Sequence, residues 1–343
     1  MTRLFYSDNQ AGVHPEVLAA ISRVNRGDAP AYGADEHTAR AVARIQEVFG
    51  AETEVLFTFG GTAANVLGLA AVLRPTESVV CAASSHMWQD ECAAPEHFLG
   101  ARLVPVEAPK GRLTPERVRR HLEAERGVHQ PRPRVLAITQ ATEWGTVYRP
   151  EQMAELARLA HEHGLLLHVD GARLTNAAAA LGVSLGAISR EVGADVVSFG
   201  GTKVGLLAAE AVLLLTPGVA HEAPRVQKQG MQLASKMRFL AAQFEALLEG
   251  DLWLRNARNA NDKATLLAER LAAVDALELA VPVETNAVFV SVDPERLPAF
   301  RQATGLPVWD PPRSIVRTMT AFDTTEEEVE AFAEKVARAL SQL

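Results

Sequence analysis

The sequence has few cysteines and no long run of basic residues. Its 343 residues include only two cysteines, Cys81 and Cys92, whose separation matches neither a zinc-ligand spacing nor a disulfide framework. The formal net charge of −8 comes without a stretch rich in Lys and Arg, which disfavours a surface for nucleic acid or for anionic membranes. We therefore expect free thiols, no bound metal and a small-molecule ligand.

Long apolar runs are also missing. The most apolar stretch, "GLLAAEAVLLL", is interrupted by Glu210 and is far shorter than the roughly 20 residues that span a bilayer. The first residues, "MTRLFYSDNQAG", contain no apolar core of a secretory signal. From these features we expect a cytoplasmic protein without a membrane partner.

Short runs rich in Val, Ile and Leu alternate with helix-like stretches over the first two thirds of the chain. The strand candidates are "VLFTF", "SVVCAA", "RVLAIT", "LLLHVD", "DVVSFG" and "AVLLL". Their near-continuous apolarity is typical of strands that helices cover on both faces. Residues 150–163 between them have a helical apolar pattern, and Gly164 follows as a C-cap glycine. The predicted fold class is α/β, with a mostly parallel sheet.

The pattern changes towards the C-terminus. A long helix is predicted over residues 226–250, and a second one continues to about residue 271. Two strand candidates follow, "NAVFVSV" and "SIVRTMT", and then a final amphipathic helix whose Thr325 and Glu328 offer a capping box. We expect a large domain over residues 1–245, with an N-terminal arm, and a smaller α+β domain over residues 246–343.

The stretch "LLLHVDGARL" places an acid at the end of an apolar strand. Side chains alternate along a strand, so His168 and Asp170 share one face there. Ligands bind at the carboxyl ends of strands in α/β sheets. Three interpretations of Asp170 stay open on this evidence: a helix N-cap, a metal ligand, or a partner for a cationic group of a ligand.

The stretch "FTFGGTAANVLGLAAVL" runs from a strand through Gly60 and Gly61 into a helix that Thr62 opens. Bare N–H groups and the positive helix end favour an anion at such a start. The stretch lacks the Lys-Ser/Thr ending of a phosphate loop and the third glycine of a dinucleotide fingerprint. A simple tight turn is the alternative.

Lys203 follows two glycines in "FGGTKVG", again at the end of an apolar run. An apolar site lowers the pKa of a lysine and makes its amine a usable nucleophile, whereas a lysine on a surface loop would have no such role. An anion seat, a strand-end acid and a strand-end lysine together meet the needs of pyridoxal phosphate: its phosphate, its pyridine nitrogen and its Schiff base. Their order suits an aspartate-aminotransferase-like fold.

The motifs "SDN", "YGADEHT", "GGTAAN", "SSHM", "HVDGAR" and "SFGGTKVG" occur along the chain in this order. The sequence thereby resembles the threonine aldolase and β-eliminating lyase family, and its "GGTK" form is similar to the low-specificity L-threonine aldolase branch. The resemblance implies a pyridoxal-phosphate-dependent fold of type I and a homo-oligomer, dimer or tetramer, with active sites at the subunit interface. Lys236 is a candidate for reaching the phosphate of a neighbouring subunit.

The resemblance also implies roles for individual residues around the cofactor. Lys203 forms the Schiff base, Asp170 pairs with the pyridine nitrogen, and His86 stacks over the ring near the β-carbon of the substrate. The phosphate is expected at Gly61, Thr62 and Ala63, with help from Thr202.

The substrate carboxylate is expected between two arginines. By the same resemblance, Arg173 lies near the ring oxygen and the carboxylate, and Arg317 binds the carboxylate from the small domain, since a guanidinium can bond both oxygens at once. Ser7, Tyr32 and Asp35 are further implied contacts, with ordinary loop roles as the alternative.

Two positions depart from the family pattern. Glu143 stands where many relatives carry a histidine, so a carboxylate is expected to assist the β-hydroxyl, and Val204 stands where a polar residue is common. The implied activity is retro-aldol cleavage of β-hydroxy-α-amino acids such as L-threonine, L-allo-threonine and phenylserine to glycine and an aldehyde. A β-elimination lyase and, less favoured, a non-catalytic binding protein of the same fold are the alternatives.

Overall fold

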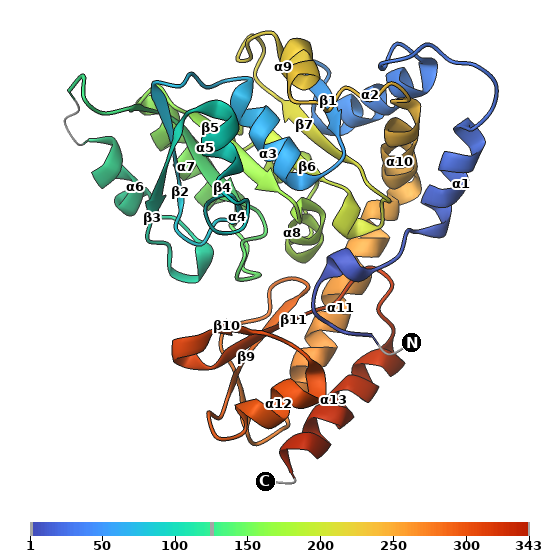
Figure 1. Cartoon of the computed structure of the whole chain (residues 1–343), viewed down its shortest axis with the longest axis vertical. Helices are drawn as coiled ribbons and strands as arrows, with labels where there is room; N and C mark the ends of the chain where they lie inside the picture. The colour runs from blue at the N-terminus through green and yellow to red at the C-terminus, as the bar shows by residue number, and fades with distance from the viewer. Residues whose placement is uncertain (1–2, 124–126, 342–343) are drawn as a thin grey trace.

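The apolar runs of the first two thirds of the chain form one seven-stranded sheet in the computed structural model, which describes residues 3–123 and 127–341 (Figure 1). The strand order is β1-β7-β6-β5-β4-β2-β3, and only β7 runs antiparallel to its neighbours. The strand bounds are Glu54–Thr58 (β1), Glu77–Ala82 (β2), Arg102–Val106 (β3), Arg132–Thr139 (β4), Leu166–Gly171 (β5), Val196–Gly200 (β6) and Glu210–Leu214 (β7). The predicted runs and the α/β class are confirmed.

Helices cover both faces of this sheet because alternate strand residues point to opposite sides. Ile138 and Val169 belong to the core on one face, whereas Ala137 and Val212 belong to the core on the other. The first face is covered by α1 (Pro15–Val24), α2 (Glu36–Phe49), α7 (Pro150–Glu162), α8 (Leu174–Leu181) and α10 (Arg238–Leu248). The second face is covered by α3 (Gly61–Ala70) and α9 (Ala223–Gln229). The predicted helix over 150–163 is confirmed as α7, and Gly164 follows it at φ +71°.

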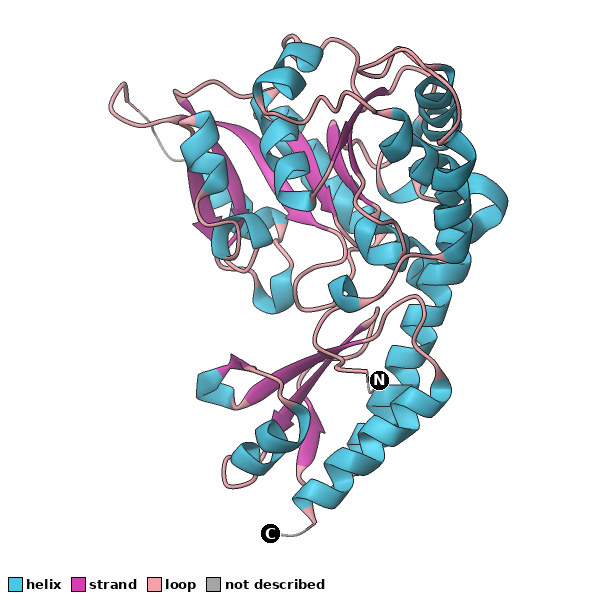
Figure 2. Cartoon of the chain, turned by 45° about the vertical axis from the view of Figure 1, so that its right-hand side comes forward, coloured by secondary structure: helices cyan, strands magenta, loops and turns pink. Residues whose placement is uncertain are grey.

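The C-terminal third forms a second, antiparallel sheet of four strands in the order β10-β11-β9-β8, which Figure 2 shows apart from the first sheet. Its strands are Leu277–Leu279 (β8), Ala287–Val292 (β9), Val308–Asp310 (β10) and Ile315–Met319 (β11). The helices of this part are α11 (Leu252–Ala272), α12 (Leu297–Thr304) and α13 (Glu326–Leu340). The long helix α11 packs against both α8 and α13 and thereby connects the two parts (Figure 1). The division at residue 245 stays a prediction.

Two expectations about the C-terminal half have different outcomes. The capping box is confirmed, since the Thr325 side chain accepts from the N–H of Glu328 and the Glu328 carboxylate accepts from that of Thr325. The single helix over 226–250 is wrong, because the chain breaks between α9 and α10. A Cβ at Gly230 would lie 2.3 Å from Leu67 of α3, so the chain passes close over α3 and turns away.

Between these elements lie the short helices α4 (His86–Gln89), α5 (Ala94–Leu99) and α6 (Pro115–Leu122). None of the helices in the described ranges is long and apolar enough to cross a membrane. The same residues contain no group of three or more His, Cys, Asp or Glu side chains that could hold a metal ion. Cys81 and Cys92 are both free thiols.

Candidate active site

A cavity of about 320 Å³ lies where the ends of several strands of the large sheet meet the N-terminal arm and the small sheet. The strand ends bring side chains from distant parts of the sequence to one place, as expected for an α/β sheet. The predicted site residues that line this cavity are Ser7, Gly61, Thr62, His86, Glu143, Asp170, Arg173, Lys203 and Arg317. The cavity therefore gathers most of the residues that the motifs indicated.

One wall is the start of α3, which has no side-chain cap. The N-cap is Gly60, in an extended conformation, and a Cβ added at Gly60 or Gly61 would meet nothing within 4 Å. The first N–H groups of a helix have no partner inside the helix, so they are available to an anion. The Ala63 side chain lies in a neighbouring apolar groove, so Ala63 can offer only its N–H.

Asp170 lies near the end of β5, one residue before Gly171, and is almost fully buried. Its Oδ1 accepts from the N–H of Ala172 at 3.0 Å, and its Oδ2 accepts from Nδ2 of Asn65 at 3.0 Å. The following helix, α8, has Arg173 at its N-cap, so Asp170 is not the cap of that helix. Of the three interpretations of Asp170, a partner for a cationic group of a ligand agrees best with this position.

Lys203 lies in the short turn that follows β6. Glu210 on β7 holds this turn, since its carboxylate accepts from the N–H groups of Gly201 at 2.7 Å and Thr202 at 3.3 Å. Burial lowers the pKa of Lys203, and the charge of Arg173 lowers it further. The Lys203 amine is therefore more readily neutral than that of an exposed lysine.

The glycines before Lys203 serve the packing of the backbone. A Cβ at Gly200 would lie 2.5 Å from the carbonyl oxygen of Ala172, and one at Gly201 would lie 2.3 Å from a methyl carbon of Leu206. Val204, after the lysine, is buried in the main core and does not line the cavity. An apolar residue suits this position because it faces the core.

His86 and Glu143 lie side by side on another wall. Oε1 of Glu143 accepts from the backbone N–H of His86 at 2.7 Å and from the hydroxyl of Thr139 at 2.9 Å. Oε2 of Glu143 is buried, and among the described residues it has no hydrogen-bond partner. Burial, helped by the charge of Asp170, raises the pKa of Glu143 to about 7. Glu143 can therefore exchange a proton near neutral pH.

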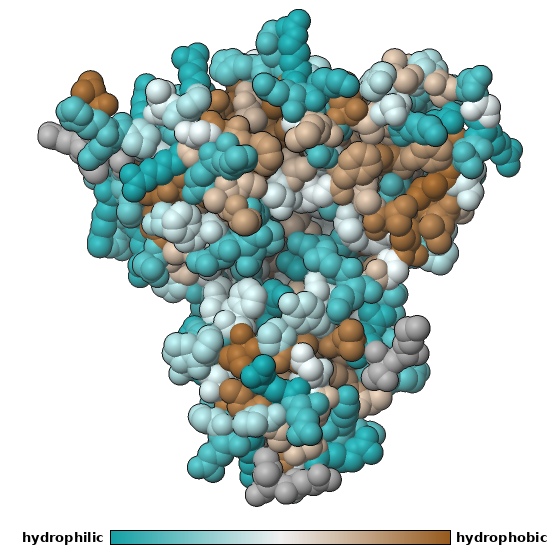
Figure 3. Space-filling view, viewed as in Figure 1, coloured by the Kyte–Doolittle hydropathy of each residue, from teal (hydrophilic) through white to brown (hydrophobic). Residues whose placement is uncertain are grey.

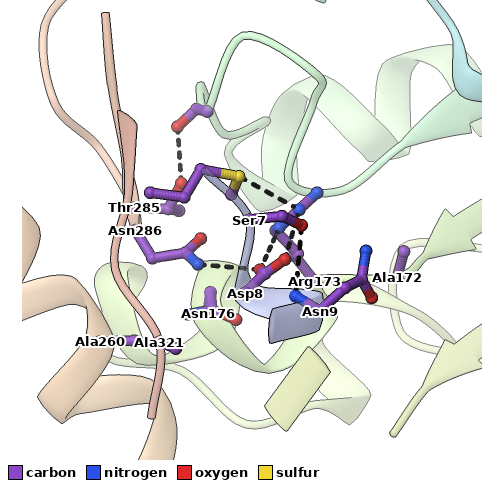
Figure 4. A network of polar contacts seen from close by, with 12 residues as sticks. Ser7, Asp8, Asn9, Ala172, Arg173, Asn176, Ala260, Thr285, Asn286 and Ala321 are labelled. Atoms are coloured by element: carbon purple, nitrogen blue, oxygen red, sulfur yellow. Dashed lines mark hydrogen bonds and ion pairs between the residues drawn. The ribbon is translucent and has the colours of Figure 1, made fainter. Parts of the chain in front are cut away.

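The two arginines have different environments. Arg173 donates from Nε and Nη2 to the buried carboxylate of Asp8, at 2.7 and 2.8 Å (Figure 4). Arg317 lies over the ring of Trp309, 4.4 Å from its centroid, and burial lowers its pKa to about 10. No carboxylate among the described residues forms an ion pair with Arg317, so Arg317 is the freer of the two for an anionic ligand.

This constellation agrees with the similarity of the chain to known proteins. Residues 5–295 match the family described as "Beta-eliminating lyase". The chain belongs to this family. A low specificity L-threonine aldolase from Pseudomonas aeruginosa is 45% identical over 301 residues, 88% of this chain and 87% of that protein. A second one, from a Pseudomonas species, is 40% identical over 338 residues, 98% of each chain.

Solved structures give the same result for the fold. The threonine aldolase of Leishmania major superposes with a TM-score of 0.92 at 29% identity, over 98% of this chain and 99% of that one. An aspartate aminotransferase from Thermus thermophilus superposes with a TM-score of 0.70 at 21% identity, over 99% and 97%, which shows the fold alone. The large sheet of this β-eliminating lyase family member thus has an aspartate-aminotransferase-like arrangement.

Some residues that the resemblance singled out lie outside the cavity in this family member. Tyr32 is exposed, with Nζ of Lys228 5.1 Å from its ring centroid, and Asp35 is buried as the N-cap of α2, where it accepts from Thr38. Thr202 stands next to the cavity without lining it, and Lys236 is exposed. Their functional roles stay predictions.

The structure adds three polar residues that the motif reading passed over. Asp8 holds Arg173, Asn65 contacts Asp170, and Glu91 contacts His86. Asp8 and Asn65 stand inside the quoted motifs "SDN" and "GGTAAN", so their sequence signal was present. Glu91 lies in "WQDEC", where no pattern distinguishes it from a surface acid.

Proposed function

We propose that this chain is a pyridoxal-phosphate-dependent aldolase that cleaves β-hydroxy-α-amino acids to glycine and an aldehyde. L-Threonine, L-allo-threonine and phenylserine are the proposed substrates. One observation carries the proposal: Lys203, half-buried and with a lowered pKa, shares one cavity with the Asp170 carboxylate and the uncapped start of α3. The names of the relatives, low specificity L-threonine aldolase, support the choice of reaction.

The cavity fits the cofactor by the chemistry of its donors. Lys203 would bond to the cofactor aldehyde, Asp170 would pair with the pyridine nitrogen, and the N–H groups at Gly61, Thr62 and Ala63 would hold the phosphate. The open space at Gly60 and Gly61 leaves room for that phosphate. When bound, pyridoxal phosphate supplies an electron sink for the breaking of a bond at Cα.

The side chains of this protein supply the positioning of the substrate. Arg317, packed on Trp309 and without an ion-pair partner among the described residues, would bind the α-carboxylate. Ser7 lines the same cavity, and its hydroxyl would donate to the same carboxylate. Arg173 is held by Asp8 in a fixed orientation, so it contributes mainly positive charge there. A substrate oriented in this way has already lost its translational and rotational entropy on binding, so the barrier of the chemical step is lower.

Glu143 and His86 are placed to handle the proton of the β-hydroxyl. An ionised Glu143 can accept this proton, and with its pKa raised to about 7 it can release the proton again. His86 lines the same cavity and can hold the hydroxyl in place. A carboxylate with suitable proton affinity would thus act at the position where the family resemblance implies a histidine.

Glu143→Gln is expected to lower the turnover of L-threonine by about 10²-fold, the low end for a positioned acid or base. Glu143 accepts a proton only when ionised, and its pKa is raised to about 7, so the rate of the unmodified protein should rise as the pH rises through about 7. The variant should lose this rise. The measurement is the pH dependence of kcat for both proteins, and an unchanged profile with unchanged turnover would remove Glu143 from the mechanism.

The assembly is also part of the proposal. Large apolar side chains at Phe59, Phe98 and Met231 are exposed near the start of α3, beside an apolar groove of about 520 Å³. Figure 3 shows apolar side chains gathered in places on the large-domain part of one face. Such surface favours a homo-oligomer with active sites at its interface, where the exposed Lys236 could contact a neighbour's phosphate. Light scattering should give a dimer or tetramer, and a monomer would contradict this part.

The reaction itself is tested with three substrates. The purified protein, loaded with pyridoxal phosphate, is incubated with L-threonine, phenylserine and a β-substituted alanine. Glycine with an aldehyde from the first two supports the aldolase, whereas pyruvate from the third supports the β-elimination lyase. Cofactor binding without any product would support a non-catalytic protein. The cytoplasmic location, expected from the sequence, remains part of the proposal.

A further inference from the structure

A buried carboxylate outside the predicted set lies directly behind His86. The Glu91 side chain has no exposed surface, and its Oε1 lies 3.0 Å from Nδ1 of His86. The same Oε1 accepts from Nδ2 of Asn65 at 2.9 Å. No lysine or arginine among the described residues forms an ion pair with Glu91. The burial of a carboxylate costs free energy unless the group is hydrogen-bonded, so these contacts with His86 and Asn65 are needed to hold Glu91 in this place.

Asn65 links this acid to the acid at the end of β5. Its Nδ2 carries two hydrogens, and the structure directs one to Glu91 and the other to Oδ2 of Asp170, at 3.0 Å. Oδ1 of Asn65 is buried without a partner among the described residues. Both N–H groups of the Asn65 amide therefore donate to carboxylates and hold them in fixed places.

The contact with Glu91 determines the form of the His86 ring. An ionised carboxylate only accepts hydrogen bonds, so with Glu91 ionised the Nδ1 of His86 carries the hydrogen that it donates to Oε1. In the neutral ring, Nε2 is then the acceptor. A carboxylate behind an imidazole fixes its tautomer and orientation in this way in many enzymes.

We infer that Glu91 and Asn65 are positioning residues, with Glu91 fixing the Nδ1-protonated form of His86 and Asn65 tying Glu91 to Asp170. The contribution to catalysis rests on the proposed function, whereas the effect on the His86 ring does not. Glu91 is thereby linked directly to His86 and, through Asn65, to Asp170. In the proposed reaction His86 faces the β-hydroxyl and Asp170 faces the pyridine nitrogen. Within residues 3–123 and 127–341, Asn65 is the single residue that contacts both carboxylates through one nitrogen.

The electrostatics around His86 agree with this inference. The hydrogen bond to Glu91 is the largest cause of a raised pKa at His86, with burial acting against it. Asp170 raises the pKa further and Lys203 lowers it, while Glu143 accepts from the backbone N–H of His86. Removal of the charge of Glu91 should therefore lower the pKa of His86.

The first test follows the His86 ring by ¹⁵N NMR in the full-length protein without cofactor. Above the pKa of His86, the unmodified protein should show the Nδ1–H form, and Glu91→Gln should lower the pKa of His86 by about one unit. Glu96→Gln, the same change on α5, is the control and should leave both unchanged. The Nε2–H form in the unmodified protein would overturn the inference without the need for any variant.

The second test separates positioning from folding and from cofactor binding. Glu91→Gln should lower kcat for L-threonine at least about tenfold with KM changed less than about twofold, because a displaced His86 ring no longer holds the β-hydroxyl in place, whereas the carboxylate site stays intact. Asn65→Ala should leave the attachment of the cofactor at Lys203 almost unchanged. It should also shift the pKa of His86. Retained kcat with an unmoved His86 pKa would refute the inference, whereas absence of threonine cleavage by the unmodified protein would refute only the proposed function.

Discussion

Lys203→Ala is expected to abolish the cleavage of L-threonine and the covalent attachment of the cofactor. Loss of a nucleophile typically costs several orders of magnitude in kcat, so we expect a decrease of about 10⁴-fold or more. The measurement has two parts: turnover, and mass spectrometry of the borohydride-reduced protein. Reduction should add the mass of the cofactor to the peptide that contains Lys203 in the unmodified protein and to no peptide of the variant.

The surroundings of Lys203 explain why this lysine is singled out. Burial and the charge of Arg173 lower its pKa, whereas Asp8, Asp170 and Glu210 raise it and limit the shift. Glu210 holds the turn that carries Lys203, and the backbone packs tightly at Gly200 and Gly201. The backbone position from which the Lys203 side chain extends is therefore fixed.

Lys335→Ala, on the exposed side of α13, is the control and should keep full activity and the reduced adduct. A Lys203→Ala protein that still gave a reduced adduct on a single lysine would show that another residue holds the cofactor. Retained turnover would contradict the proposed mechanism as a whole.

The large sheet could be predicted because its strands are continuous apolar runs buried on both faces. The strand that escaped prediction, β3, lies at the edge of the sheet, and its "RLVPV" contains a proline and is partly exposed. Edge strands tolerate such residues because one side of their backbone needs no partner. The break between α9 and α10 was missed because the approach of Gly230 to Leu67 is a tertiary contact, which helical periodicity does not report.

The same division applies to the candidate site. Asp170 and Lys203 follow strands, and Gly61 opens a helix after one, so local patterns located all three. The contacts of Asn65 with Asp170 and of Asp8 with Arg173 join residues 105 and 165 positions apart. No spacing rule reports such pairs, because they depend on the way in which α3 and the N-terminal arm pack against the sheet.

Asp8 also shows how the arm connects the two sheets. Its Oδ2 accepts from Arg173 at the N-cap of α8 and from Nδ2 of Asn286 near β9 (Figure 4). Asn286 donates as well to the carbonyl of Thr320 after β11. Burial opposes the charge of Asp8, but Arg173 and Lys203 outweigh it, and the pKa of Asp8 is lowered. The Asp8 carboxylate therefore stays ionised. It holds Arg173 of the large-sheet part in a fixed position relative to Asn286 of the small-sheet part.

Asp170→Asn is expected to lower the turnover of L-threonine by about 10²–10⁴-fold, since removal of one partner from a buried charge pair costs about 3–5 kcal/mol. The variant has nearly the same shape, and its side-chain oxygen can still accept from Asn65 or from the N–H of Ala172. The change therefore tests the charge that would face the pyridine nitrogen. Reduction with borohydride should still attach the cofactor at Lys203, because the amine is unaltered.

A second consequence separates this role from general damage to the site. Asp170 raises the pKa of Lys203, so its replacement by asparagine should lower that pKa further and extend cofactor attachment to lower pH. Asp262→Asn, at an exposed position on α11, is the control and should change neither turnover nor this pH dependence. Full turnover in Asp170→Asn would show that no ionised acid is needed at this place. Lost turnover together with lost attachment would instead indicate a collapsed cavity, because the charge of Asp170 and the Lys203 amine act in different steps.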